Sequence, residues 1–514
     1  MSFDAVLGRA ARRAPEAFGD GVLRNLYAGA WHQVGDPVAL VSPVDGSSVT
    51  SLAKVDSRTA EAAVHAAATA HSGWSATSLP QRQAQVGAAV DALADAHDDL
   101  ALLLAWEIGK PWRLACADVD RALDGVRWYL QEIAQMLGTD VDGAPCQRRP
   151  LGGPVSNISS WNYPMSVQVH AELVQLLAGN GVVAKAPTQG GALTLTLAHA
   201  LMADAGLPVT LLSGDGETLS DALVRSPELG AVAFVGGRSN GGRVAAQLVD
   251  TGKRHFLEQE GLNAWGIWNF SDWDGLAGHL RKGYEYAKQR CTAYPRFVIQ
   301  RGLVDQFLAM YLPMVSALQF GHPVAVAEAG DPLPDLDFGP LISAAKATEL
   351  AARVEEALQW GAVPLYRGSL DPARFVAGQD TSAYAAPVAL LAPPGASRLM
   401  HEEPFGPVDT IVVVDSEAEL LAQMNASNGA LVASIACDDD ALAGELAQQV
   451  QAFKVGINKP RSRGDKAEPF GGRSASWKGA FVGGAQLVQA VTLGPPNERL
   501  YGNFPGTSRY PAAL

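Results

Sequence analysis

The sequence contains little cysteine and no long hydrophobic run. Its four cysteines, in 514 residues, show neither paired metal-ligand spacing nor the density of a disulfide-stabilised protein. No stretch of about 18 apolar residues is present, and the first residues lack the apolar core of a signal peptide. We therefore expect a cytoplasmic protein with reduced thiols, without a metal site, and with no part in secretion or membrane spanning.

Positive charge is also scarce. The chain carries 39 Lys and Arg residues against 53 Asp and Glu residues, which gives a formal net charge of -14. A negative field of this kind disfavours nucleic acid and anionic membranes as partners. Any site for an anionic ligand must therefore supply its own basic residues. A chain of 514 residues is too long for one hydrophobic core, so two or three domains are expected.

The order of the expected elements indicates an α/β protein. Strands and turns are expected between residues 23 and 55, and helices from Ser57, a predicted helix cap, to residue 137. The first 20 residues favour a frayed tail over a short amphipathic helix. Two blocks of alternating strands and helices follow, at about 152–257 and 262–452, and such alternation predicts parallel, doubly wound sheets. The expected strands are Val182–Lys185, Val209–Leu212, Ala231–Val235, Arg296–Gln300 and Thr410–Val414. The expected helices of the second block are 303–318, 343–360 and 442–451.

One cysteine stands among cationic neighbours. Cys291 lies close in sequence to Lys288, Arg290 and Arg296. Positive charge favours the thiolate, which is the reactive form of cysteine, so Cys291 is a candidate nucleophile. The alternative is a small buried hydrophobic residue, the commoner fate of a cysteine. Glu258, 33 positions upstream and next to an apolar strand, is a candidate base.

Several further motifs occur around these two residues. They are Ser160-Trp-Asn-Tyr-Pro164, Lys185-Ala-Pro-Thr188, Phe234-Val-Gly-Gly237, Lys288-Gln-Arg-Cys-Thr-Ala293, Glu402-Glu-Pro-Phe-Gly-Pro-Val408, and Asn458 followed by Pro469-Phe-Gly-Gly472. In this order they resemble the aldehyde dehydrogenase superfamily from about residue 25 to about residue 495.

The resemblance implies an aldehyde dehydrogenase-like α/β fold with two doubly wound βα domains. Residues 1–128 and 152–260 would form a Rossmann-type dinucleotide-binding domain, and residues 261–453 a catalytic domain. Residues 129–151 and 480–514 would form an oligomerisation arm and tail, which implies a homodimer or homotetramer.

The resemblance also assigns the chemistry. The thiolate of Cys291 would attack an aldehyde to give a thiohemiacetal, which loses hydride to a nicotinamide and leaves a thioester. Glu258 would activate the water that hydrolyses this thioester. The side-chain amide of Asn162 and the backbone N–H of Cys291 would stabilise the oxyanion.

For the cofactor, the resemblance places Lys185 at the adenosine ribose, Glu403 at the nicotinamide ribose and Phe405 near the nicotinamide ring. Thr188 stands where NAD-dependent members often carry a glutamate, which removes repulsion toward a 2′-phosphate. NADP is therefore the expected cofactor, with NAD possible. The remaining residues expected to bind it are Ser160, Trp161, Gly236 and Gly237.

At the substrate end, three segments are similar to those of non-phosphorylating NADP-dependent glyceraldehyde-3-phosphate dehydrogenases. The positions that hold the substrate phosphate there correspond to Arg121, Tyr163, Arg290 and Arg463. An anionic aldehyde, phosphorylated or carboxylated, is thus expected. The alternative is that these basic residues are only solvated and that the substrate is a semialdehyde or a neutral aldehyde oxidised with NAD.

The chain departs from the family pattern at several positions. The usual Glu-Leu-Gly-Gly-Lys becomes Glu258-Gln-Glu-Gly-Leu262, Gly237 replaces a serine or threonine, Ser160 replaces a proline, and Lys288 stands at a usual glycine. These changes keep open a non-catalytic relative that binds ligands, and an acyl transfer to coenzyme A. The segment Gly237-Arg-Ser-Asn-Gly241 also fits a serine hydrolase elbow, although no recognisable histidine partner follows.

Overall fold

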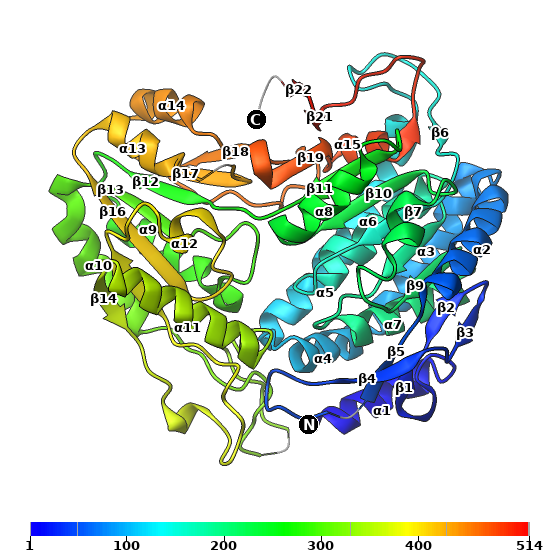
Figure 1. Ribbon diagram of the computed structural model, residues 1–514, viewed down its shortest axis with the longest axis horizontal. Helices are drawn as coiled ribbons and strands as arrows, with labels where there is room; N and C mark the ends of the chain where they lie inside the picture. Colours follow the sequence, from blue (N-terminus) through cyan, green and yellow to red (C-terminus); the bar gives the residue numbers. More distant parts are fainter. Residues whose placement is uncertain (1, 49, 329, 428, 512–514) are drawn as a thin grey trace.

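Short runs of aliphatic and β-branched residues form two large sheets. The structure is a computed structural model that describes residues 2–48, 50–328, 330–427 and 429–511. Figure 1 shows the two sheets on opposite sides of the molecule, the first at the right and the second at the left.

The first sheet has the strand order β22-β21-β19-β11-β10-β7-β8-β9-β2-β3. Strands β11, β10, β7, β8 and β9 are mutually parallel, and the strands at both edges are antiparallel to their neighbours. The strands are β2 (Asn25–Tyr27), β3 (Ala30–His32), β7 (Val155–Ile158), β8 (Val182–Lys185), β9 (Val209–Leu212), β10 (Ala231–Val235), β11 (Arg254–Glu258), β19 (Trp477–Ala480), β21 (Gly502–Phe504) and β22 (Thr507–Arg509).

The second sheet has the order β14-β15-β16-β13-β12-β17-β18, parallel except for the edge strand β14. Its strands are β12 (Ala264–Ile267), β13 (Arg296–Gln300), β14 (Val363–Arg367), β15 (Val388–Leu391), β16 (Val408–Val414), β17 (Val432–Ala436) and β18 (Lys454–Ile457). A small sheet holds β1 (Val22–Leu23), β5 (Thr50–Lys54) and β4 (Asp36–Leu40), and β6 (Arg149–Pro150) pairs with β20 (Thr492–Leu493). The expected α/β class with parallel sheets is confirmed.

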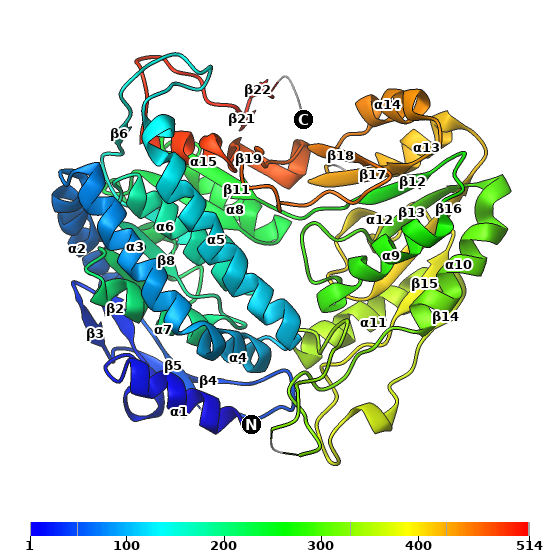
Figure 2. The ribbon, with the colours of Figure 1, turned by 180° about the vertical axis from the view of Figure 1, so that it is seen from behind.

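Helices cover both faces of the first sheet. Figure 1 shows α8 on one face, whereas Figure 2 shows α3, α5 and α6 on the other. The helices of this half are α1 (Phe3–Arg13), α2 (Ser57–Ser75), α3 (Leu79–Asp95), α4 (His97–Glu107), α5 (Trp112–Leu137), α6 (His170–Leu177), α7 (Ala192–Asp204), α8 (Arg238–Leu248) and α15 (Ala485–Ala490). Those of the second are α9 (Trp273–Gly283), α10 (Val304–Ser316), α11 (Ala344–Gln359), α12 (Arg398–His401), α13 (Glu417–Met424) and α14 (Asp440–Gln449). Short helical turns are η1 (Gly19–Gly21), η2 (Pro164–Val169), η3 (Asp221–Arg225), η4 (Glu285–Lys288), η5 (Arg301–Leu303), η6 (Pro372–Arg374) and η7 (Ser474–Ser476).

The N-terminal segment corrects one prediction, because residues 3–13 form helix α1 and not a frayed tail. Phe3 and Val6 are buried on its inner face, while Arg9 and Arg13 form ion pairs of 2.6 and 2.5 Å with Asp99 of α4. These partners lie far apart in sequence, so local pattern does not reveal them.

The predicted cap of α2 is displaced by one residue. The side chain of Asp56, not that of Ser57, accepts a hydrogen bond from the backbone N–H of Thr59 at 2.8 Å.

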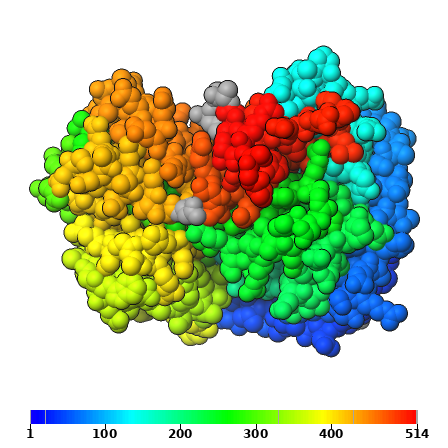
Figure 3. All heavy atoms as spheres, turned by 45° about the horizontal axis from the view of Figure 1, so that its top comes forward, coloured from blue at the N-terminus to red at the C-terminus, as the bar shows by residue number. Residues whose placement is uncertain are grey.

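The C-terminal segment returns to the first half of the chain. Strand β19 joins the first sheet beside β11, and β21 and β22 extend the same edge. A buried ion pair of 2.6 Å between Arg148 and Glu498 ties the segment to residues 138–150. Figure 3 shows it in red between the two halves of the molecule. The assignment of residues 480–514 as a tail stays a prediction, and residues 512–514 lie outside the described residues.

Candidate active site

A cavity of about 770 Å³ lies where the carboxyl ends of β7, β10 and β11 meet loops of the second half. This is the edge at which parallel α/β sheets bind ligands. It is lined by residues from both halves of the chain. Of the residues predicted for the site, those that line it are Arg121, Ser160, Trp161, Asn162, Tyr163, Gly236, Gly237, Glu258, Arg290, Cys291, Glu403, Phe405 and Arg463.

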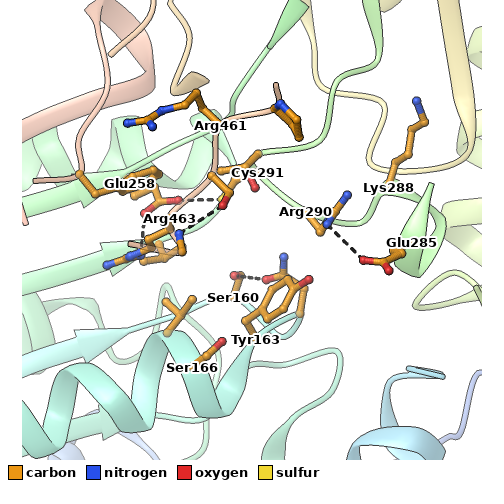
Figure 4. A pocket seen from close by; sticks show the side chains of 18 of the residues that line it. Ser160, Tyr163, Ser166, Glu258, Glu285, Lys288, Arg290, Cys291, Arg461 and Arg463 are labelled. Atoms are coloured by element: carbon orange, nitrogen blue, oxygen red, sulfur yellow. Dashed lines mark hydrogen bonds and ion pairs between the residues drawn. The ribbon is translucent and has the colours of Figure 1, made fainter. Parts of the chain in front are cut away.

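Cys291, Glu258 and Arg463 form a connected row inside this cavity (Figure 4). The thiol of Cys291 donates to Oε1 of Glu258 at 2.8 Å, and Nη1 of Arg463 lies 3.0 Å from Oε2 of the same carboxylate. Glu258 is the last residue of β11 and is only 2% exposed. A buried carboxylate held between a cation and a thiol can accept the proton of that thiol.

The ionisation of Cys291 differs from the prediction made from its sequence neighbours. Burial and then the charge of Glu258 raise the pKa of the thiol well above its usual value, and Arg463 opposes this shift. The thiol is therefore protonated in the free protein. The cation beside it comes from a loop 172 positions away, and not from residues 288–296.

The three neighbouring cations are engaged elsewhere. Lys288 is buried, pairs with Asp409 and donates to the backbone oxygen of Tyr294 at 3.0 Å. Arg296 donates to backbone oxygens in the second half, and Arg290 donates to that of Gly283 at 2.9 Å.

The turn before Cys291 explains why the side chain of Lys288 does not reach the sulfur. Tyr286, Ala287 and Lys288 all have positive φ values, between 53° and 59°, a region that L-residues rarely occupy. Burial of Tyr286 and the pairing of Lys288 hold this conformation. As a result, Lys288 points away from Cys291 (Figure 4).

Asn162 lies in the loop that follows β7 and is 5% exposed. Its Nδ2 donates to the backbone oxygen of Gln289 at 3.0 Å, and its Oδ1 accepts from the hydroxyl of Ser160 at 2.6 Å. These bonds fix the amide beside the segment that carries Cys291 and leave one amide N–H for another acceptor.

Lys110 supports this region and was not predicted from the sequence. Its ammonium is buried, donates to the backbone oxygen of Asn162 at 2.7 Å, and pairs with Asp118 at 2.9 Å. It also lies 3.9 Å from the ring centroid of Tyr163. The only sequence signal is a lysine in the Gly109-Lys-Pro111 break between two helices.

One end of the cavity is lined by hydrogen-bond donors. Arg121 of α5, Arg290 and Arg463 reach it together with Tyr163. Burial raises the pKa of Tyr163 to about 12, so its phenol remains a donor at neutral pH. His170 also lies there, and burial lowers its pKa to about 3, so the ring is neutral. This end can bind an anion by charge and by hydrogen bonds.

The other end is lined by Gly236, Gly237, Glu403 and the rings of Trp161 and Phe405. The two rings meet edge to face at 5.7 Å between centroids. The Oε1 atom of Glu403 is buried without a hydrogen-bond partner in the described part of the chain. An unused carboxylate oxygen beside bare backbone and aromatic surfaces fits the ribose and ring of a dinucleotide.

Lys185 and Thr188 lie outside the lining of this cavity. Lys185 ends β8 and its ammonium donates to the backbone oxygen of Ala186 at 3.1 Å, while burial lowers its pKa to about 8. Thr188 is exposed in the following loop. Their part in binding a cofactor stays a prediction.

Ser239 of the serine-hydrolase motif is exposed in α8, and no hydrogen bond joins it to a histidine in the described ranges of the chain. In the same ranges, His, Cys, Asp and Glu side chains do not gather as a metal-ligand group. No helix found in them has the length and hydrophobicity to cross a membrane.

Comparisons with known proteins show the family of the chain. The aldehyde dehydrogenase family model matches residues 31–493. The NADP-dependent glyceraldehyde-3-phosphate dehydrogenase of Streptococcus equinus is 27% identical over 486 residues, covering 91% of this chain and 97% of that protein. The betaine aldehyde dehydrogenase of Cereibacter sphaeroides is 28% identical over 481 residues, covering 90% and 95%.

A solved structure confirms the fold. The NADP-dependent glyceraldehyde-3-phosphate dehydrogenase of Bacillus halodurans, complexed with NADP, superposes with a TM-score of 0.81 and 26% identity. The match covers 92% of this chain and 98% of that one. With the family match over most of its length, the protein belongs to the aldehyde dehydrogenase family of oxidoreductases.

Proposed function

We propose that this protein oxidises an anionic aldehyde to a carboxylic acid with NADP, through a thioester on Cys291. The observation that carries the proposal is the contact of 2.8 Å between the Cys291 thiol and the Glu258 carboxylate. It lies between an end of the cavity lined by guanidinium groups and an end shaped for a dinucleotide.

In the first step, Glu258 accepts the thiol proton as Sγ of Cys291 bonds to the aldehyde carbon. The raised pKa of the thiol makes this transfer necessary, because little thiolate exists beforehand. The oxyanion that forms would accept from the free amide N–H of Asn162 and from the backbone N–H of Cys291.

The bound dinucleotide supplies the acceptor for the hydride that leaves this tetrahedral carbon. Loss of hydride converts the adduct on Cys291 into a thioester. Glu258 first releases the proton of the thiol to solvent and becomes a carboxylate again; beside the sulfur, it then removes a proton from a water molecule that attacks the thioester. Hydrolysis releases the acid and returns the thiol.

The substrate class follows from the donors at the cationic end. Arg121, Tyr163, Arg290 and Arg463 would hold a phosphate or carboxylate of the aldehyde. The Streptococcus equinus relative, named for a phosphorylated aldehyde, supports this choice. The betaine aldehyde dehydrogenase relative keeps a non-anionic aldehyde as the second candidate.

The choice of NADP depends on the loop after β8. Thr188 offers a hydroxyl where an acid would repel a 2′-phosphate, and Lys185 lies three positions before it. The Bacillus halodurans structure was solved with NADP, which supports the same nucleotide here. NAD is the alternative.

The test is an assay of the purified protein with NADP or NAD and matched phosphorylated, carboxylated and neutral aldehydes. We expect kcat/KM to be at least about tenfold higher for an anionic aldehyde with NADP, since hydrogen bonds to charged groups contribute about 1.5–3 kcal/mol. Release of free acid without coenzyme A would support hydrolysis. No reduction of either nucleotide with any aldehyde would contradict the proposal.

We also propose the domain division 1–128 with 152–260, and 261–453, and a cytoplasmic homodimer or homotetramer associated through 129–151 and 480–514. Strand β6 of the first segment pairs with β20 of the second, and Arg148 forms an ion pair with Glu498. These contacts support the proposal that the two segments associate as one unit. Light scattering during gel filtration would measure the assembly, and a monomeric mass would refute it.

A further inference from the structure

The N-terminus of α8 is capped by a carboxylate from another strand. Its N-cap residue is Gly237, which has no side chain to accept from the first turn. Oε1 of Glu260, two residues after the end of β11, accepts from the backbone N–H of Arg238 at 3.2 Å. Oε2 accepts from the backbone N–H of Glu403 at 3.4 Å. Glu260 is one of the departures from the family pattern, as is Gly237.

This helix end has the properties of an anion site on a parallel sheet. Helix N-termini carry unpaired N–H groups and a partial positive charge, and α8 follows β10 at the carboxyl edge of the sheet. Gly236 and Gly237 line the cavity, so bare backbone separates the helix end from it. A Cβ atom at Gly237 would lie 3.7 Å from Oε1 of Glu260.

Unpaired buried atoms around Glu260 provide a second, independent observation. Nε and Nη2 of Arg238 are buried without hydrogen-bond partners within the described ranges, as is Oε1 of Glu403. Arg238 thus offers a counter-charge to whichever anion lies at this helix end. Glu260 and Glu403 together place two carboxylates in the part of the cavity that fits a dinucleotide.

We propose that Glu260 is an internal anion on the α8 N-terminus, in the place that the diphosphate of the dinucleotide would take. The diphosphate must then displace this carboxylate before it can reach the helix. Glu260 therefore weakens dinucleotide binding and is the residue that sets its affinity. The inference rests on the proposed function, because it requires a dinucleotide enzyme.

The experiment compares wild-type protein with Glu260→Gln, which keeps the shape of the side chain and an oxygen that accepts from Arg238. Isothermal titration measures the dissociation constants of NADP, ADP and adenosine. We expect NADP and ADP to bind about five- to tenfold more tightly to the variant, because one negative charge next to the diphosphate is removed. Adenosine, which carries no phosphate, should bind both proteins equally.

Glu285→Gln is the matched control, since Glu285 lines the same cavity at its other end. It should leave all three dissociation constants unchanged. Glu260→Ser is a second variant that withdraws the carboxylate altogether and should change the constants in the same direction. Thermal melts show whether each variant is folded.

Two outcomes would overturn the inference: unchanged or weaker binding of NADP and ADP to both Glu260 variants, or an equal gain for adenosine. Failure of the wild-type protein to bind any dinucleotide would instead overturn the proposed function. The two failures are therefore distinguishable.

Discussion

The two ends of the cavity differ in the carboxylates with which their cations pair. At the substrate end, Arg463 pairs with Glu258 at 3.0 Å and Arg290 lies 3.9 Å from Glu285, whereas Arg121 forms no ion pair with another described residue. At the nucleotide end, Lys346 pairs with Glu349 at 2.7 Å and Arg353 pairs with Glu402 at 3.1 Å. At the substrate end a cation is thus paired with the carboxylate beside Cys291, whereas Lys346 and Arg353 at the nucleotide end pair with other carboxylates.

We expect the cationic end to bind an anionic aldehyde even though the protein as a whole is acidic. The net charge of -14 repels anions at long range, so attraction must come from donors that have few internal partners. Arg121 is such a donor at the substrate end, whereas Glu260 and Glu403 place carboxylates at the nucleotide end. Cys291 and Glu258 lie where the two ends meet, and Arg463 joins them to the substrate end.

Replacing the sulfur removes the nucleophile where the two ends meet and has the largest expected effect. Cys291→Ala should lower kcat by about 10⁴-fold or more, since covalent catalysis needs the nucleophile. Dinucleotide binding should remain, because the nucleotide end is unchanged. Reduction of NADP in the presence of aldehyde measures the loss, and full activity of this variant would rule out the covalent route.

Asn162 is the proposed oxyanion donor and lies between the two ends of the cavity. Its loss should therefore leave the residues that bind substrate and dinucleotide in place. Asn162→Ala should lower kcat by about 10²- to 10³-fold, as expected for the loss of one such donor. KM should change little. Asn157→Ala is a control for the loss of a buried asparagine nearby, since Asn157 bonds to Gln175 and not to the site. An equal loss of kcat in both variants would assign the effect to stability.

Substitution of Arg463 tests most directly whether the substrate end of the cavity selects an anionic aldehyde. Arg463→Gln should lower the ratio of kcat/KM for an anionic aldehyde to that for a neutral one by about 10- to 100-fold. Loss of Arg463 also affects Glu258, but that effect is the same for both aldehydes and cancels in the ratio of their kcat/KM values. NADP affinity should stay the same, and Arg301→Gln, at an exposed surface pair with Asp415, is the control. An unchanged ratio would show that Arg463 does not contact the substrate.

The smallest expected effect is on the pH at which Cys291 is alkylated. Burial and the charge of Glu258 raise the pKa of the Cys291 thiol, so thiolate forms only above the ordinary range. Alkylation of Cys291 by iodoacetamide should therefore have its midpoint above about 8.5, the ordinary value for cysteine. Glu258→Gln should lower that midpoint because it removes a neighbouring negative charge. Labelling of Cys291→Ala measures the background from the other cysteines. A wild-type midpoint below the ordinary value would contradict this arrangement.

Much of the fold is predictable because its strands are short, apolar and bounded by turns. The predicted Val209–Leu212 and Ala231–Val235 coincide with β9 and β10. Helix α1 has a local signal in Ser2, whose side chain accepts from the N–H of Ala5, but its packing depends on contacts of Phe3 and on the distant Asp99. Local sequence does not contain that information.

In the active site, too, local sequence does not reveal which distant residues a side chain contacts. The motifs predict which residues gather around Cys291; most of these residues line its cavity, whereas Lys185 and Thr188 do not. They do not predict side-chain direction, because the left-handed turn through Lys288 carries its ammonium to Asp409. The position of Glu260 at the start of α8 is likewise a tertiary contact, made by a residue that sequence could only mark as unusual.

The central claim is that the substrate becomes bound to the sulfur of Cys291 as an acyl group. Glu258→Gln should slow hydrolysis of the thioester, so the intermediate should accumulate when this variant is mixed with NADP and an anionic aldehyde at alkaline pH. Acid quenching followed by intact-mass and peptide analysis measures it directly. One acyl group on the peptide that contains Cys291, with none on Cys291→Ala, is the predicted result. Turnover with no adduct, or with an adduct on another residue, would contradict the account.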